Sequence, residues 1–198
     1  FEDGTLSHAD ALKWGFIEYS PSDHTLFGPN IGSQYATWLI SPALAVSATD
    51  PLVISFVGRH QFEAPNYDGG VIEYSSDGGM TWQDITTIPG TVLNPAYSGN
   101  LDPLNQLGAR AAYRGNSASL PAFIPFTVTV PAASPVAGQS IKVRLGVGTD
   151  PAVGAYGWEI DDISVTGITN TPFTQLVAQP EACVVAENLF GDGFEEQN

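Results

Sequence analysis

The segment Ile141–Val147 reads IKVRLGV, and its apolar residues alternate with the basic residues Lys142 and Arg144. Successive side chains of a β-strand point to opposite faces, so a strand here would place four apolar side chains on one face. Those side chains are Ile141, Val143, Leu145 and Val147. The alternation therefore predicts a half-buried strand of an antiparallel sheet.

A second segment, Leu52–Val57 (LVISFV), is a continuous β-prone run, which favours a strand buried on both faces. Further strands are expected at Trp38–Ile40, Gly70–Ser75, Trp82–Ile85, Phe123–Val130 and Trp158–Thr166. Pro and Gly punctuate the gaps between these strands, and no window of helical length keeps a 3.6-residue apolar stripe. These features predict an all-β fold, a two-sheet antiparallel sandwich over residues 1–168. Residues 169–198 lack alternation, and we expect an irregular C-terminal extension there.

The composition limits the partners of this chain. Six Lys and Arg residues stand against 21 Asp and Glu residues, which gives a formal net charge of −15. Such a charge repels nucleic acids and anionic membranes.

No stretch approaches the about 18 apolar residues of a membrane helix, so we expect a soluble chain. The abundant Gly, Pro, Thr and Ser suit a secreted β-protein, and Cys183, the single cysteine, cannot form an intrachain disulfide.

Acidic residues gather at both ends of the expected sandwich. Glu2 and Asp3 lie near the start, and Asp161 and Asp162 lie in the last expected strand. A two-residue period puts Asp161 on the same face as Ile163 and Val165, which would be the core face. A bare carboxylate there is costly, whereas a bound Ca²⁺ would keep it ionised. The alternatives are an ion pair with Arg59, Arg110 or Arg144, or a solvated sheet edge.

Motifs for catalysis are weak in this sequence. It contains no H-E-x-x-H zinc motif and no G-x-S-x-G nucleophile elbow, and His8, His24 and His60 are scattered. A triad assembled from distant loops, or an acid pair for glycoside hydrolysis, remains an alternative that no motif selects. The stretch Tyr74–Trp82 (YSSDGGMTW) matches the Asp-box of sialidases but occurs once, so it predicts a tight hairpin and not a propeller.

Four tyrosines occur beside Gly, Asn or Pro in segments whose composition is typical of loops. They are Tyr67, Tyr97, Tyr113 and Tyr156. Tyrosines on the loops of a rigid sandwich can form a platform for a sugar or a protein. They can equally be corner residues that tie loops to the backbone through their hydroxyl groups. Both interpretations stay open from the sequence.

The order of several segments resembles a known family. FEDG, WLISPAL, YDGGVIEYSSDGGMTW, RAAYRGNS and AGQSIKVRLGVGTDPAVGAYGWEIDDISVTG follow one another through residues 1–168. This succession resembles the MAM-like jelly-roll modules found next to the catalytic domains of secreted bacterial metallopeptidases of the fungalysin and immune-inhibitor-A type. The ending DGFE, within residues 169–198, is similar to a short C-terminal signature of exported bacterial proteins.

The resemblance implies a jelly roll that performs no turnover and acts as an accessory module of a secreted or periplasmic bacterial protein. It implies a structural Ca²⁺ held by Glu2, Asp3, Asp161 and Asp162, with Asp68 as a further ligand. Its partners would be the attached catalytic domain and an extracellular protein or glycan. The chain lacks the cysteines of animal MAM domains, so a role in cell adhesion does not transfer. The alternative function is a carbohydrate-binding module that uses the four loop tyrosines.

Overall fold

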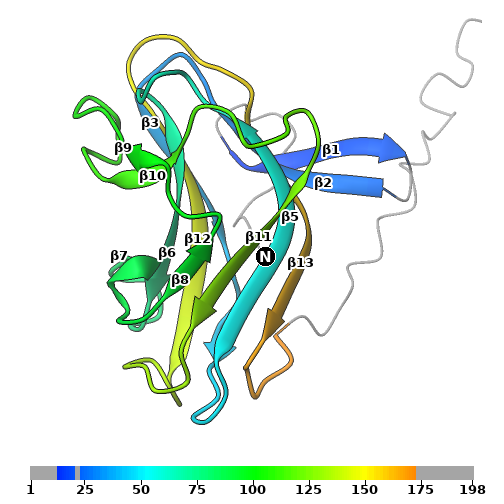
Figure 1. Cartoon of the computed structure of the whole chain (residues 1–198), viewed down its shortest axis with the longest axis vertical. Coiled ribbons are helices and arrows are strands. Elements are labelled where there is room, and N and C mark those ends of the chain that lie inside the picture. The colour runs from blue at the N-terminus through cyan, green and yellow to red at the C-terminus, as the bar shows by residue number, and fades with distance from the viewer. Residues whose placement is uncertain (1–12, 21–22, 173–198) are drawn as a thin grey trace, which may run out of the picture.

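The computed structural model describes residues 13–20 and 23–172, and these residues form two antiparallel β-sheets packed face to face (Figure 1). The six-stranded sheet has the order β1 (Gly15–Ser20), β2 (Asp23–Pro29), β13 (Gly157–Thr166), β5 (Leu52–Gln61), β11 (Ile124–Val130) and β8 (Val92–Asn94). The seven-stranded sheet has the order β3 (Tyr35–Ile40), β12 (Ser140–Thr149), β6 (Gly69–Ser75), β10 (Ala111–Arg114) and β9 (Gly99–Asn100), with β4 (Leu44–Ala45) paired to β12 and β7 (Gln83–Asp84) to β6. One short 3₁₀ turn, Ile85–Thr87, follows β7. The predicted all-β sandwich is confirmed.

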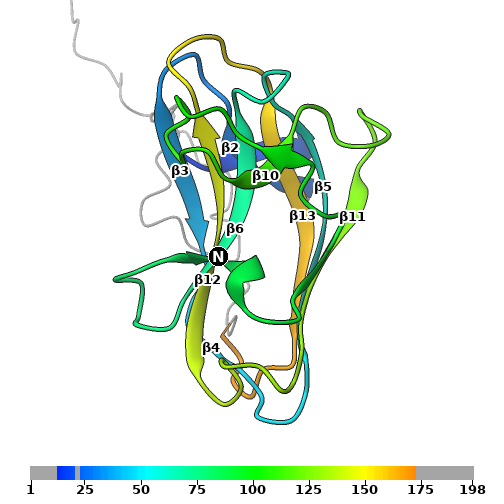
Figure 2. The same cartoon turned by 60° about the vertical axis from the view of Figure 1, so that its left-hand side comes forward.

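The strand order identifies the sandwich as a jelly roll. Strands β2, β13, β5 and β11 are consecutive neighbours in one sheet, and β3, β12, β6 and β10 are consecutive neighbours in the other. Successive long strands mostly alternate between the two layers, as two interleaved Greek keys require. The two layers are separated clearly in Figure 2, where β3, β12 and β6 lie on one side and β5, β13 and β11 on the other.

Alternating burial defines the core between the sheets. On β12 the side chains of Ile141, Val143, Leu145 and Val147 are buried as the sequence predicts. On β5 only one face is buried, with Leu52, Ile54 and Phe56 inside and Val53, Ser55 and Val57 half-buried on the outside. The prediction that this strand is buried on both faces is therefore wrong. Nothing of the opposite sheet covers its outer face, because the sandwich has only two layers.

An aromatic cluster fills one part of the core. Trp158, Tyr113, Phe126 and His60 lie within aromatic contact of one another, with Tyr113 and Trp158 centroids 5.5 Å apart. His60 Nδ1 lies 3.0 Å from Gly115 O, and burial lowers the pKa of its imidazole. Gly70 lies under Trp158, where an added Cβ would approach the indole to 2.7 Å. His60 is therefore a core histidine at a strand end, as its sequence context indicated.

The Asp-box stretch forms the tight turn between β6 and β7. Gly78 and Gly79 have φ angles of 80° and 103°, which glycine adopts without strain. The Asp77 carboxylate accepts hydrogen bonds from the backbone N–H groups of Met80 and Thr81 and from the Ser75 hydroxyl. This hydrogen bonding lowers the pKa of Asp77. The stretch thus has a structural explanation in a hairpin.

The last strand contains a bulge that changes the expected orientation of its acids. The register of β13 against β5 shifts between Asp161 and Ser164, and Asp162 has a φ of 52°. Asp161 pairs with Val57 on the outer face, while Ile163 and Val165 pack against the core. The expectation that Asp161 shares the core face with these two residues is wrong, since the one extra residue of the bulge reverses the alternation.

Some expected features lie outside the described residues. They are Glu2, Asp3, His8, Cys183 and the segment 173–198, which contains DGFE. Beyond β13, Thr169 N donates to Ala45 O and the Asn170 side chain contacts the backbone of the β4 region. The described chain therefore stays attached to the sandwich at least as far as Asn170.

Candidate metal centre

Three acidic residues meet at the end of the sandwich where β5 and β12 end and β6 begins. This end of the sandwich lies at the top of Figure 1. Asp68 directly precedes β6, and Asp150 directly follows β12. Because these strands are antiparallel and Gly69 pairs with Gly148, the register brings the two aspartates together. Glu63 lies two residues after β5, which belongs to the other sheet. We call Glu63, Asp68 and Asp150 the acidic cluster.

The carboxylates of the acidic cluster are close, and two of their oxygens lack a hydrogen bond. One oxygen from each residue lies within 4.8 Å of the other two. Asp68 is 0% exposed, and its Oδ1 accepts a hydrogen bond of 2.7 Å from Asp150 N. Its Oδ2, like Glu63 Oε2, is buried without a hydrogen-bond partner. Buried polar atoms almost always have a partner, so these two oxygens are free to accept a proton donor or to coordinate a cation.

The electrostatics of the acidic cluster disfavour the charged carboxylates. Burial raises the pKa of Asp68 to about 7, and the charges of Asp150 and Glu63 add to this effect. The hydrogen bond from Asp150 N and the nearby Asn30 amide act in the opposite direction, although Asn30 Nδ2 itself is buried without a well-formed hydrogen bond. Burial and the charge of Asp150 also raise the pKa of Glu63. A nearby cation would relieve all of these costs.

Arginine does not supply that cation. The ion pairs between described side chains use other acids, namely Glu18, Glu73, Asp84 and Glu159. Glu73 is contacted by both Arg110 and Arg144, and Glu159 by Arg59. Asp68 is therefore buried without an ion pair to any described basic side chain.

The donor set of the acidic cluster suits a hard cation. Carboxylate oxygens are the preferred ligands of Ca²⁺ and Mg²⁺, whereas a structural zinc site normally uses Cys or His. Ca²⁺ takes about 6 to 8 oxygen ligands, so water would complete a shell begun by three carboxylates. The residues present thus fit Ca²⁺ and would hold it through Asp68 Oδ2, Glu63 Oε2 and an oxygen of Asp150.

Five metal ligands were expected from the sequence, and one of them, Asp68, belongs to the acidic cluster. Asp161 lies on the outer face of β13, and Asp162 is exposed in the bulge, so neither joins it. The sequence analysis missed Asp150, because only the pairing of β6 with β12 reveals that it lies near Asp68. It also missed Glu63, which the loop after β5 brings to the two aspartates. The available signal was an acid at the boundary of each strand, with Asp68 before GGVIEYS and Asp150 after IKVRLGVGT.

The loop tyrosines separate into two groups. Tyr113 is 2% exposed in the core, and Tyr97 OH exchanges hydrogen bonds with the backbone of Ile72 while burial raises its pKa. These two are corner residues whose hydroxyl groups bond to the backbone, so neither is available for a binding platform. Tyr67 and Tyr156 remain exposed by 37% and 36%.

Comparison of the chain with known protein families and with characterised proteins gives no match. Among the described residues there is no helix of the length and apolarity that crossing a membrane requires. The functional argument therefore depends on the geometry of the fold and of the acidic cluster.

Proposed function

We propose that this chain is a non-catalytic jelly-roll module that binds one structural Ca²⁺ in the acidic cluster. The observation that carries the proposal is Asp68, a fully buried carboxylate with one unpartnered oxygen and two further carboxylates beside it. A divalent cation would convert mutual repulsion among three acids into shared coordination.

The cation would act as a clamp between the two layers. It would join Glu63, which follows a strand of the six-stranded sheet, to Asp68 and Asp150 on the seven-stranded sheet. Binding to the folded state alone stabilises that state by mass action. In a chain with a single cysteine, such a clamp takes the place that a disulfide occupies in many exported domains.

The module would serve a larger exported bacterial protein, which we propose to be a metallopeptidase. The support is the ordered resemblance of residues 1–168 to MAM-like accessory modules, together with the jelly-roll topology. A rigid sandwich stabilised by a cation can hold a neighbouring catalytic domain or present its own surface to a target. The location we propose is accordingly the cell surface or the surrounding medium, where free Ca²⁺ is abundant.

Isothermal titration calorimetry tests the cation site directly. The protein is first freed of metal with EGTA, and Ca²⁺ and Mg²⁺ are titrated separately into the wild type, Asp68→Asn and Asp150→Asn. We expect one site per chain in the wild type, with Ca²⁺ preferred, and affinity reduced at least about tenfold in each variant because ligand charge sets the affinity of such sites. Asp161→Asn is the matched control, since it removes the same charge outside the acidic cluster.

Two results would contradict the proposal. Equal loss of affinity in Asp161→Asn would show a diffuse charge effect, and no Ca²⁺ binding by the wild type would remove the metal site. The accessory role has a separate test, in which the isolated chain is incubated with casein and with polysaccharides. We expect no hydrolysis, and turnover by the purified chain would show an enzyme instead.

A further inference from the structure

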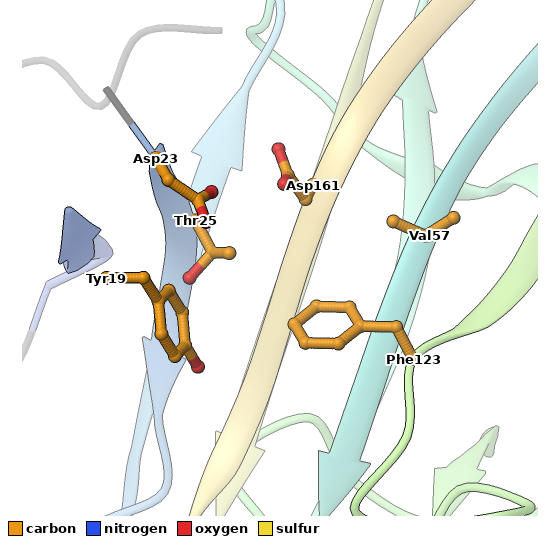
Figure 3. Close-up of a pocket in the computed structure, with 6 residues that line it drawn as sticks. All are labelled: Tyr19, Asp23, Thr25, Val57, Phe123 and Asp161. Carbon is orange, nitrogen blue, oxygen red and sulfur yellow. The ribbon is translucent and has the colours of Figure 1, made fainter. Parts of the chain in front are cut away.

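A pocket of about 210 Å³ opens on the outer face of the six-stranded sheet, and it shares no residue with the acidic cluster (Figure 3). Its lining comes from β1, β2, β5, β13 and the segment before β11, namely Tyr19, Asp23, Thr25, Val57, Phe123 and Asp161. We call it the outer pocket. Its volume is below the about 300 to 1,000 Å³ of sites that enclose a whole small molecule, so one side chain suits it better.

The bulge of β13 gives the outer pocket its acidic wall. Asp161 is opposite Val57 in the register of β13 and β5, and it points outward just before the alternation reverses. Asp23 lies at the start of β2, the neighbour of β13 on the other side. Figure 3 shows both carboxylates at the same end of the pocket, with Tyr19 and Phe123 on either side of its other end.

The two aromatic side chains of the outer pocket, Tyr19 and Phe123, are held in place by Glu159 and Arg59. Tyr19 OH donates to Glu159 Oε1 at 2.6 Å and accepts from Arg59 at 2.6 Å. The Arg59 guanidinium also lies 4.8 Å from the centroid of the Phe123 ring and donates to Pro121 O. The ring positions are thus set before any ligand arrives, which limits the entropy lost on binding.

The charge balance of the outer pocket is negative. The positive charge of Arg59 is matched by the buried Glu159 at 2.8 Å. Asp23 and Asp161 take part in none of the ion pairs formed between described side chains. Within the described part of the chain, two carboxylates at the pocket therefore have no ion-pair partner, in a chain with a formal net charge of −15.

The hydrogen-bonding groups of the pocket accept and do not donate. The hydroxyl protons of Tyr19 and Thr25 are both directed to Glu159, at 2.6 Å and 2.7 Å. The carboxylates of Asp23 and Asp161 offer only acceptors. A sugar needs donors as well as acceptors, whereas Lys and Arg side chains are donors alone.

We propose that the outer pocket binds the cationic end of a Lys or Arg side chain presented by a basic protein partner. The alkyl stem would lie between the Tyr19 and Phe123 rings over Val57, and the ammonium or guanidinium group would meet Asp23 and Asp161. Cation–π attraction and charge pairing act together in this arrangement. The proposal is independent of the Ca²⁺ site, because no residue is shared between the two.

NMR titration of the full chain tests this proposal with small probes. The probes are the N-acetyl methylamides of lysine, arginine and norleucine, the last of which has an apolar stem without the cation. We expect saturable shifts around Tyr19, Phe123 and Asp161 with the lysine or arginine probe, and none with norleucine. The comparison of lysine with arginine identifies which cation the pocket prefers.

Variants locate the contact. Asp161→Asn and Phe123→Leu should each weaken binding about two- to fivefold, as expected for exposed cation–π and ion pairs. Asp162→Asn is the matched control, because it removes the same charge from the adjacent residue, which does not line the pocket, and asparagine tolerates its φ of 52°. Asp68→Asn should leave probe binding unchanged and so separates this site from the acidic cluster.

Three outcomes would overturn the proposal. Equal shifts with the norleucine probe would show an apolar site, and saturable shifts with methyl glucoside at these residues would show a sugar site. Shifts of Asp161 with Ca²⁺ alone that persist in Asp68→Asn would show a second metal site. No saturable shift with either cationic probe would show that the pocket binds no such side chain.

Discussion

Glu159 and Asp68 are both fully buried carboxylates, yet the protein surrounds them in opposite ways. Glu159, on the outer face of β13, accepts hydrogen bonds from Tyr19, Thr25 and Tyr156 and pairs with Arg59. Asp68 receives one backbone hydrogen bond and faces two other acids. The comparison separates an acid whose charge the chain itself compensates from one whose charge the chain leaves largely uncompensated.

The pKa directions follow from this difference. Burial alone would raise the pKa of Glu159, but hydrogen bonds from Tyr156, Tyr19, Thr25 and Arg59 outweigh it and lower the pKa. At Asp68 the single backbone hydrogen bond and the Asn30 amide are too weak, so burial and the neighbouring charges raise the pKa to about 7. The number of hydrogen-bond donors around each of these buried carboxylates thus decides whether its pKa is lowered or raised.

Among the substitutions, the largest expected loss of stability comes from breaking the compensation of Glu159. Arg59→Ala should lower the free energy of unfolding by about 3 kcal/mol, since removal of one partner leaves the other charge buried. Chemical denaturation at pH 7 measures this loss. In the double variant Arg59→Ala with Glu159→Gln, we expect part of the loss to return, because no uncompensated charge remains. A double variant that is less stable by the sum of both single losses would contradict this account.

The pH dependence of stability should have opposite signs at the two acids when Ca²⁺ is absent. The pKa of Asp68 rises from its ordinary 3.8 to about 7 on folding, so its contribution is lost as the pH rises between these values and stays constant above 7. Glu159 has a lowered pKa, so its contribution is present above the unfolded value and is lost as the pH falls through the folded value.

The measurement is the unfolding free energy in EGTA from pH 4 to 8 for the wild type, Asp68→Asn and Glu159→Gln. Relative to Asp68→Asn, the wild type should lose up to about 4 kcal/mol as the pH rises from 4 to 7. Relative to Glu159→Gln, the wild type should gain stability as the pH rises from acid to neutral. Slopes of the same sign for both differences would contradict the contrast.

The smallest expected effect concerns the acids of the bulge. Asp161→Asn and Asp162→Asn should each change the unfolding free energy by less than about 0.5 kcal/mol, as is usual for solvent-accessible surface positions. Both variants should keep the full stabilisation by Ca²⁺, which thermal unfolding with and without the ion measures. A loss of that stabilisation in either variant would place the ion at β13 and not in the acidic cluster.

The fold could be predicted from the sequence further than the site could. Alternation in Ile141–Val147 and turn residues such as Gly78 and Gly79 act locally, so the sequence alone gave the right strand and hairpin. The hairpin of β1 and β2 was missed, because its residues do not alternate cleanly. The bulge at Asp161 was also missed, because a regular two-residue alternation gives no sign of where the side chains change face.

The site depends on contacts between distant segments. Asp68 and Asp150 are brought together only by the register of β6 and β12, and Glu63 by the path of the loop that leaves β5. Sequence analysis selected Asp161 as the buried acid of β13, whereas the buried acid is Glu159, two residues earlier. The alternation in the sequence indicated that one acid of β13 would be buried and would need partners. Which acid is buried depends on which face of the strand each side chain occupies, and the sequence did not reveal this.

The most direct test of the central claim is the unfolding free energy of the wild type and Asp68→Asn at pH 8, each in EGTA and in Ca²⁺. In EGTA we predict that Asp68→Asn is at least as stable as the wild type, because it removes an uncompensated charge and keeps an acceptor for Asp150 N. In Ca²⁺ at about 100 times its dissociation constant, the wild type should gain about 2.7 kcal/mol, while the variant gains little. A wild type that exceeds Asp68→Asn by the same amount in both buffers would contradict the claim that Asp68 is compensated by a bound cation.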